Sequence, residues 1–209
     1  MLKSSQETIN RKILYAQAVF GEEEKQAVLR SMDNKWLASG PLVAEFEKKV
    51  AKLFGKKFGI AVNSGSSANL IAIQSLHLPK GAEVITPACT FSTTVSTIIN
   101  NNLVPVFVDA IIGRYTIDEG LIEKAITEKT KIIMVPQLVG GVCDMPKLRK
   151  IANKHKLFLI DDSCDTFAPH IDGRTAASYS DLTTTSFYGS LIITTLGCGG
   201  MVLTDDEKL

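Results

Sequence analysis

Closely spaced cysteines are missing from this sequence of 209 residues. Its four cysteines lie far apart and form no Cys-x-x-Cys pair, which argues against both a disulfide framework and a zinc site. We therefore expect reduced thiols, a cytoplasmic location and no bound metal. The four positions are Cys89, Cys143, Cys164 and Cys198.

An excess of positive charge is also missing, because 23 Lys and Arg residues balance 22 Asp and Glu residues. A surface that binds nucleic acid or an anionic membrane usually carries a basic patch. No apolar run approaches the roughly 20 residues that a membrane helix needs, and the first residues lack the apolar core of a signal peptide. We expect neither a nucleic-acid nor a membrane partner.

Short apolar segments alternate with helical patterns along most of the chain. This alternation is typical of βαβ units, so the predicted fold class is α/β, with a mostly parallel sheet flanked by helices. Residues 1–21 are expected to form an N-terminal arm, and residues 22–209 one domain. The predicted strands are 58–62, 83–86, 104–108, 131–135, 157–162, 182–187 and 201–204. The predicted helices are 22–32, 41–54, a segment after 63–68 that reaches 76, 92–100, 116–126 and 145–155.

Acidic and polar residues follow several of these strands directly. The apolar run 157–160 ends in Asp161 and Asp162, whose side chains should point to opposite faces because side chains alternate along a strand. The carboxyl ends of parallel strands share one edge, where open α/β sheets bind ligands. Alternatively, the two acids cap the following turn. The other segments expected at this edge are 63–67, 87–91, Asp109 and 137–141.

Two of these segments indicate what the ligand is. The turn Asn63-Ser-Gly-Ser-Ser-Ala68 leads into a helix N-terminus, which suits a phosphate, and Gly65 allows an anion to approach closely; a plain serine cap is the alternative. Phe91 begins the next helix, where it either stacks on a flat ring or packs in the core. Together with a strand-end carboxylate, they indicate a flat, phosphorylated heteroaromatic such as pyridoxal phosphate.

With these segments in place, the chain resembles the DegT/DnrJ/StrS family of pyridoxal-phosphate nucleotide-sugar aminotransferases and dehydratases, from about Val19 to Leu209. Further segments that carry the resemblance are 36–41, 105–109, 161–165, 186–188 and 199–202. The resemblance implies the large domain of the fold type I pyridoxal-phosphate transferases, here 22–209 and incomplete, without the small C-terminal domain. It also implies a homodimer and a nucleotide-sugar substrate.

The resemblance further implies roles for individual residues around pyridoxal or pyridoxamine 5′-phosphate. Asp162 would pair with the ring nitrogen, Phe91 would stack on the ring, and Asp165 would lie beside the ring hydroxyl. The phosphate would be held by the turn at Gly65 and by Ser66, Ser67 and Ser186. Asp161 would be a structural acid that points away from the ring.

Leu191 stands at the position that decides the chemistry in this family. Family aminotransferases have lysine there, which holds the cofactor as a Schiff base, and family sugar 3-dehydratases have histidine. Leucine has neither an amine to form an imine nor a lone pair to accept a proton. No lysine or histidine occurs between His170 and Lys208, and His170 itself is predicted to lie in a surface turn.

Three hypotheses therefore remain open. The leading one is an enzyme that resembles the 4-keto-6-deoxy sugar 3-dehydratases of deoxysugar biosynthesis, because the residues around Leu191 look closer to that branch. The second is a nucleotide-sugar aminotransferase that takes its lysine from elsewhere. The third is an inactive homologue or a fragment, which binds only the cofactor or a partner chain.

Overall fold

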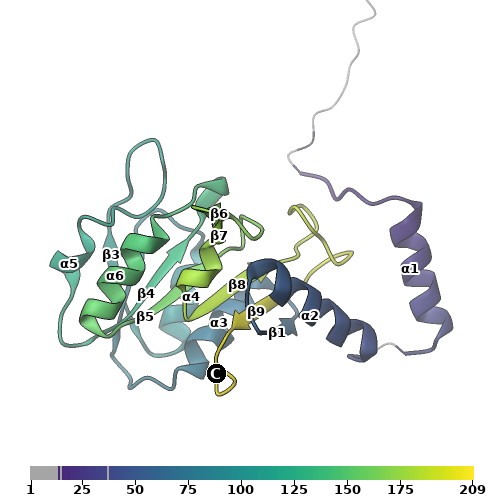
Figure 1. The fold of residues 1–209 in the computed structure, drawn as a ribbon, viewed down its shortest axis with the longest axis horizontal. Helices are drawn as coiled ribbons and strands as arrows, with labels where there is room; N and C mark the ends of the chain where they lie inside the picture. Colours follow the sequence, from purple (N-terminus) through teal and green to yellow (C-terminus); the bar gives the residue numbers. More distant parts are fainter. Residues whose placement is uncertain (1–13, 15, 37) are drawn as a thin grey trace, which may run out of the picture.

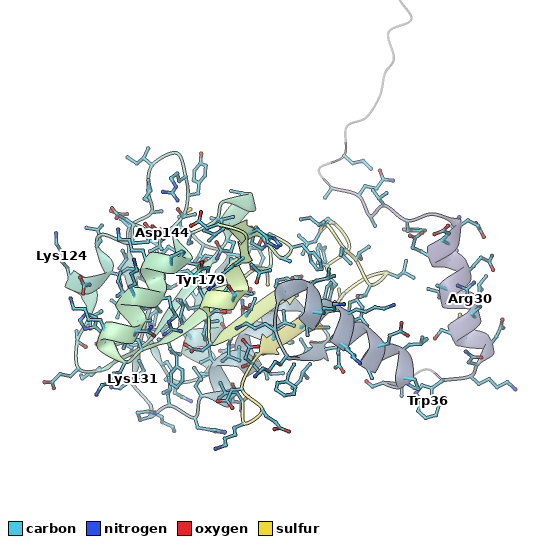
Figure 2. The ribbon with its side chains drawn as sticks, in the orientation of Figure 1. Arg30, Trp36, Lys124, Lys131, Asp144 and Tyr179 are labelled. Carbon is cyan, nitrogen blue, oxygen red and sulfur yellow. The ribbon has the colours of Figure 1, made fainter. Side chains whose placement is uncertain are left out.

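The computed structural model describes residue 14, residues 16–36 and residues 38–209. Residues 14 and 16–21 have no regular secondary structure, as expected of the arm, and the remainder of the predicted arm lies outside the described residues. Beyond the arm, a sheet lies between layers of helices (Figure 1), and charged side chains such as Lys124 project from this body (Figure 2). Within these described ranges, no helix is both long enough and apolar enough to span a lipid bilayer.

The main sheet has seven strands in the order β1-β9-β8-β5-β4-β2-β3. β9 is antiparallel to its neighbours β1 and β8, whereas the other neighbouring pairs are parallel. The predicted α/β class with a mostly parallel sheet is therefore confirmed. The strands are β1 Phe58–Val62, β2 Glu83–Pro87, β3 Val104–Val108, β4 Thr130–Pro136, β5 Phe158–Asp162, β8 Leu182–Ser186 and β9 Gly200–Thr204.

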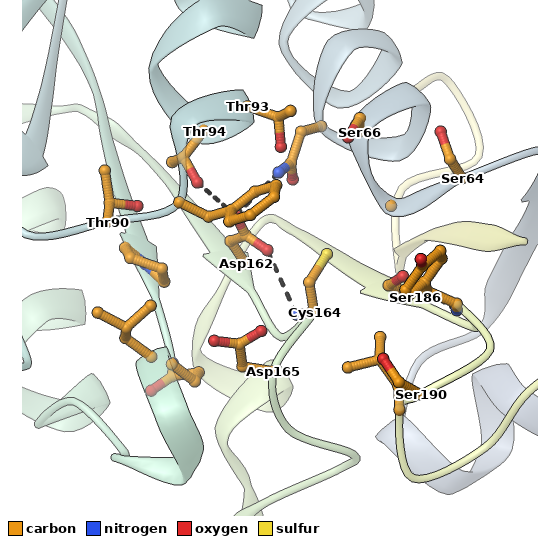
Figure 3. A pocket seen from close by; sticks show the side chains of 18 of the residues that line it. Ser64, Ser66, Thr90, Thr93, Thr94, Asp162, Cys164, Asp165, Ser186 and Ser190 are labelled. Atoms are coloured by element: carbon orange, nitrogen blue, oxygen red, sulfur yellow. Dashed lines mark hydrogen bonds between the residues drawn. The ribbon is translucent and has the colours of Figure 1, made fainter. Parts of the chain in front are cut away.

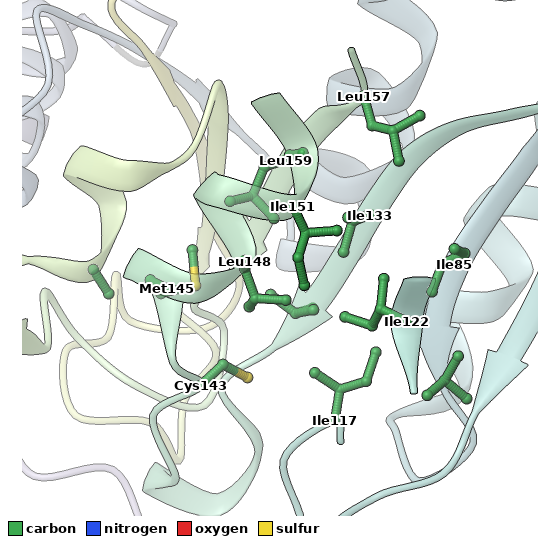
Figure 4. Close-up of a cluster of buried hydrophobic side chains, with 14 residues drawn as sticks. Ile85, Ile117, Ile122, Ile133, Cys143, Met145, Leu148, Ile151, Leu157 and Leu159 are labelled. Carbon is green, nitrogen blue, oxygen red and sulfur yellow. The ribbon is translucent and has the colours of Figure 1, made fainter. Parts of the chain in front are cut away.

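Helices cover both faces of this sheet. On one face, α3 and α4 bury apolar side chains against β2, β4 and β5. On the opposite face, Leu148 and Ile151 of α6 pack among Ile133 and Leu159 (Figure 4), and α2 packs beside β1 and β9. The helices are α1 Glu22–Asp33, α2 Pro41–Phe54, α3 Gly65–Ser75, α4 Ser92–Asn100, α5 Ile122–Ala125 and α6 Met145–His155.

The start, the end and the buried face of helix α2 all follow from its local sequence. Pro41 occupies its first turn, where a missing N–H costs nothing. Its buried side chains include Val50 and Phe54, which lie on the apolar face that the spacing predicted. Gly55 ends the helix with a φ of 70°, a left-handed conformation that favours glycine.

The helix predicted over residues 116–126 is wrong for most of its length. Only Ile122–Ala125 is helical. Ile117 instead pairs with Ala110, and the Asp118 N–H donates to Asp109 O at 2.9 Å. Because these backbone groups are used in an antiparallel bridge, a helix cannot begin until that bridge has ended.

Candidate functional site

A cavity of about 700 Å³ opens where the carboxyl ends of the parallel strands meet. Its walls come from the segments after β1, β2, β4, β5 and β8, so the predicted convergence of distant loops is confirmed (Figure 3). Asp109 does not line the cavity, although it also follows a strand. β3 is the outermost strand and lies beyond β2, which places Asp109 at the margin of the sheet.

The turn between β1 and α3 forms one wall of the cavity. Ser64 caps α3, because its Oγ accepts a hydrogen bond from the Ser67 N–H at 3.1 Å, so the capping alternative is confirmed. Ser64, Gly65 and Ser66 line the cavity, whereas Ser67 does not. The Gly65 and Ser66 N–H groups precede the first intrahelical bond, which runs from the Ala68 N–H to Ser64 O.

Asp162 lies at the end of β5 and lines the cavity, although only 4% of its surface is exposed. Its Oδ2 accepts hydrogen bonds from Asn69 Nδ2 at 2.8 Å and from Thr94 Oγ1 at 3.0 Å. Its Oδ1 accepts from the Cys164 N–H at 3.3 Å. A carboxylate with donors on both oxygens is held in one orientation, and here that orientation faces the cavity.

The neighbouring Asp161 points to the other face of the sheet, as strand alternation predicts. Its carboxylate accepts hydrogen bonds from Gln137 Nε2 at 2.7 Å and from Ser163 Oγ at 3.1 Å. Complete burial raises the pKa of Asp161 to about 6, although Gln137, Ser163 and the charge of Lys56 partly offset that effect. Asp161 is therefore part of the core and lies outside the cavity.

This burial predicts that Asp161 makes the fold less stable as pH rises. Because the pKa is raised in the folded state, the group's contribution is fully present below its unfolded value near 4 and is lost as pH rises through about 6. As pH rises from 5 to 8, the unfolding free energy of wild type should fall relative to that of Asp161→Asn. We expect this difference between the two proteins to change by on the order of 1–2 kcal/mol. Urea unfolding of both proteins at the two pH values measures this difference. A difference that does not change with pH would contradict the assignment.

Three further residues with predicted roles lie around the cavity. Phe91 precedes α4 and is 64% exposed, so the alternative that it packs in the core is wrong. Asp165 lines the cavity, and its Oδ2 accepts from the Val139 N–H at 3.1 Å, which ties the loop after β5 to the loop after β4. Ser186 also lines the cavity, and its Oγ accepts from the Tyr188 N–H at 3.3 Å.

Leu191 lines the same cavity, in the loop after β8. Among the lining residues that the structure describes, there is neither a lysine nor a histidine. His170 lies elsewhere, in a small hairpin formed by β6 His170–Ile171 and β7 Arg174–Thr175, whose turn is the Asp172-Gly173 pair with positive φ. The surface turn predicted at this point is thus the tip of a hairpin.

Sequence reasoning missed the residues that hold Asp162. Asn69 belongs to an otherwise apolar stretch of α3, and Thr94 lies in the first turn of α4. A polar residue in an apolar helical stretch was the available signal for Asn69. Its partner lies 93 positions further along the chain, which no local pattern could reveal.

The residues present fit a flat ring that carries a phosphate. A Cβ added at Gly65 would lie 2.7 Å from both Cys164 Sγ and Ser186 Cβ, so only glycine lets the start of α3 pack this closely against the segments after β5 and β8 at the cavity. Thr90 Oγ1 is buried at the cavity and makes no hydrogen bond within the part of the chain that the structure describes. Asp162 supplies a buried anion for a protonated ring nitrogen.

The fold is that of the fold type I pyridoxal-phosphate-dependent aminotransferases and dehydratases. The chain matches the DegT/DnrJ/EryC1/StrS aminotransferase family over residues 19–209, and it belongs to that family. The family expected from the motifs is therefore confirmed.

Individual relatives agree with this assignment. The chain is 40% identical to dTDP-4-dehydro-2,6-dideoxy-D-glucose 3-dehydratase of Saccharopolyspora spinosa, over 92% of this chain and 43% of the relative. It superposes with a TM-score of 0.88 and 32% identity on Escherichia coli GDP-4-keto-6-deoxy-D-mannose-3-dehydratase with bound hydrated PLP, covering 94% of this chain and 52% of the other. For Bacillus subtilis NtdA with bound PMP, the TM-score is 0.82 and the identity 33%, covering 95% and 47%.

Two facts follow from these comparisons. The chain spans about half the length of the relatives that it matches. The prediction of pyridoxal or pyridoxamine 5′-phosphate as the cofactor is confirmed at the level of the family, since one of these relatives contains hydrated PLP and the other contains PMP.

Proposed function

We propose that residues 22–209 form the large cofactor-binding domain of a nucleotide-sugar enzyme of deoxysugar biosynthesis, similar to the 4-keto-6-deoxy sugar 3-dehydratases. The domain binds pyridoxamine or pyridoxal 5′-phosphate without a covalent bond. One observation carries this proposal: Asp162, the turn at Gly65 and Leu191 line one cavity. The resemblance places Leu191 at the family's lysine or histidine position. The 40% identity to a sugar 3-dehydratase supports the dehydratase branch.

In this proposal, each lining residue has a distinct task. The N-terminus of α3 at Gly65 and Ser66 binds the phosphate, together with Ser186. Phe91 covers the ring, Asp162 holds the ring nitrogen in its protonated form, and Asp165 orders the loop beside it. When bound, the cofactor supplies an electron sink. Ser67 donates its N–H to the Ser64 cap and so stabilises the turn that binds the phosphate.

Binding without a covalent link can be tested directly on this chain. We expect both pyridoxal and pyridoxamine 5′-phosphate to bind, because the Asp162 carboxylate and the N-terminus of α3 already line the cavity. Borohydride treatment of the complex with pyridoxal 5′-phosphate should leave the intact mass unchanged, because no amine lines the cavity among the described residues. A covalent adduct of pyridoxal 5′-phosphate would overturn the proposal if excess pyridoxamine 5′-phosphate, which competes for the same site, prevented its formation. Such an adduct would favour an aminotransferase.

A second candidate, a homologue that binds the cofactor without turnover, is favoured by Leu191 itself. Leucine cannot relay a proton at the position where the dehydratase branch has histidine. The two candidates differ in whether a product is released from a 4-keto-6-deoxy sugar nucleotide in the presence of pyridoxamine 5′-phosphate. Product formation supports the enzyme, and bound cofactor without product supports the second candidate.

We also propose that the protein is a homodimer. None of the residues of α1 is buried, and Val28, Leu29 and Met32 expose apolar side chains on it. Figure 2 shows Arg30 on this helix and Trp36 beyond it, both far from the sheet. Multi-angle light scattering should give twice the mass of one chain, and a monomer at micromolar concentration would contradict this proposal.

A further inference from the structure

The Asp162 carboxylate is held by a chain of buried side chains from three other elements. Thr184 Oγ1 on β8 donates to Asn69 Oδ1 on α3 at 2.6 Å, and Asn69 Nδ2 donates to Asp162 Oδ2 at 2.8 Å. Thr94 Oγ1 on α4 donates to the same oxygen at 3.0 Å. All four side chains are at most 4% exposed, so water does not compete for these hydrogen bonds.

The direction of this chain follows from the chemistry of its members. An ionised carboxylate has no proton to donate, so Asn69 must present its Nδ2 to Asp162. Its Oδ1 then faces the opposite way and needs a donor, which the Thr184 hydroxyl supplies. Removal of the Thr184 hydroxyl would leave a buried amide oxygen without a partner and would free the amide to turn.

Asn69 lies about one helical turn from the cavity end of α3. Gly65 begins α3, and Asn69 lies four positions later, about one helical turn further along. One helix therefore carries both the backbone that faces the phosphate end of the cavity and the amide that fixes the carboxylate. Burial of an amide costs free energy unless all its polar groups are hydrogen-bonded. If position 69 served only packing, an apolar side chain would therefore cost less to bury.

We propose that Asn69, oriented by Thr184, is a positioning residue that keeps the Asp162 carboxylate directed into the cavity. Asn69 thereby sets the preference of the site for a ligand ring with a protonated nitrogen. This inference rests on the proposed cofactor site and adds to it the residues that decide how strongly the ring nitrogen is recognised.

The test compares two ligands that differ only at the ring nitrogen. Pyridoxamine 5′-phosphate carries the nitrogen, and 1-deazapyridoxamine 5′-phosphate has C–H in its place, so both use the phosphate site equally. Calorimetric titration of wild type should show a clear preference for the first ligand. We expect Asn69→Leu and Thr184→Val to reduce that preference about tenfold or more, because a hydrogen bond to a charged group is lost or loosened. Thr184→Ser keeps the hydroxyl and should keep the preference.

A matched control separates positioning from general damage. Asn101 also donates from a half-buried amide, to Leu70 O at 3.2 Å and Thr97 O at 2.9 Å, without touching Asp162. Asn101→Leu should therefore lower stability and leave the preference unchanged. The pH dependence of the bound pyridoxamine absorbance gives a second readout, because the ring nitrogen should lose its proton at lower pH in Asn69→Leu and Thr184→Val.

The outcomes distinguish the inference from the proposed function. If wild type binds neither ligand, the proposed function fails and the inference fails with it. If wild type prefers pyridoxamine 5′-phosphate and folded Asn69→Leu or Thr184→Val keeps the full preference, only the positioning role is overturned. Thr184→Val conserves side-chain volume and decides the matter should Asn69→Leu not fold.

Discussion

Replacement of Asp162 by alanine is expected to weaken the binding of pyridoxamine 5′-phosphate about a hundredfold, because a charge-assisted hydrogen bond in a buried site contributes roughly 2–3 kcal/mol. Asp162 is a buried carboxylate that lines the cavity, and its hydrogen-bond partners hold it in one orientation there. Asp162→Asn should show most of the same loss, because it keeps the shape of the side chain and removes the charge. Isothermal titration calorimetry of each variant gives the affinity directly.

A matched acid elsewhere on the sheet provides the control for this prediction. Asp109 also follows a parallel strand directly, but it does not line the cavity. Asp109→Ala should therefore bind the ligand with wild-type affinity. Because Asp162→Ala leaves the donors of Asn69 and Thr94 unpaired, circular dichroism must first confirm that the variant is folded. Unchanged affinity in folded Asp162→Ala would refute the proposed cofactor site.

Replacement of Leu191 by lysine is expected to change the chemistry of the site from no covalent capture to nearly complete capture of pyridoxal 5′-phosphate. Leu191 lines the cavity, so the introduced amine should reach the aldehyde carbon of a ligand that is bound there. Desolvation and proximity then favour condensation of the two groups over free exchange with solvent. After borohydride reduction, intact mass spectrometry should show about one ligand per chain, and peptide mapping should place it at position 191.

The next residue in the chain serves as the positional control. Ile192 is 74% exposed and does not line the cavity. Ile192→Lys introduces the same amine one position further on and should give only the background labelling of surface lysines. Leu191→Gln introduces a polar side chain of similar length without an amine and should give none at position 191. Equal labelling of Leu191→Lys and Ile192→Lys would show that position 191 does not face the bound ring.

Most of the fold could be predicted from the sequence because its signals are local. The helix α2 illustrates this, since Pro41 at the start, Gly55 at the end and the spacing of Val50 and Phe54 are all read from neighbouring residues. The prediction failed at residues 116–126, where a bridge to residues 109–110 takes the backbone groups that a helix would use. That competition depends on a strand that lies outside any local window.

The sequence by itself determined the alternation of strands and helices, the opposite directions of Asp161 and Asp162, and the absence of an amine or imidazole at Leu191. Each of these follows from residue identity or from the two-residue period of a strand. Only the tertiary structure decided that Asp162 lies in the cavity, that Asp109 does not, and that Asn69 and Thr94 hold the carboxylate. The reason is that strand order and contacts across the sheet are set by how all the elements pack together, and no short segment contains that information.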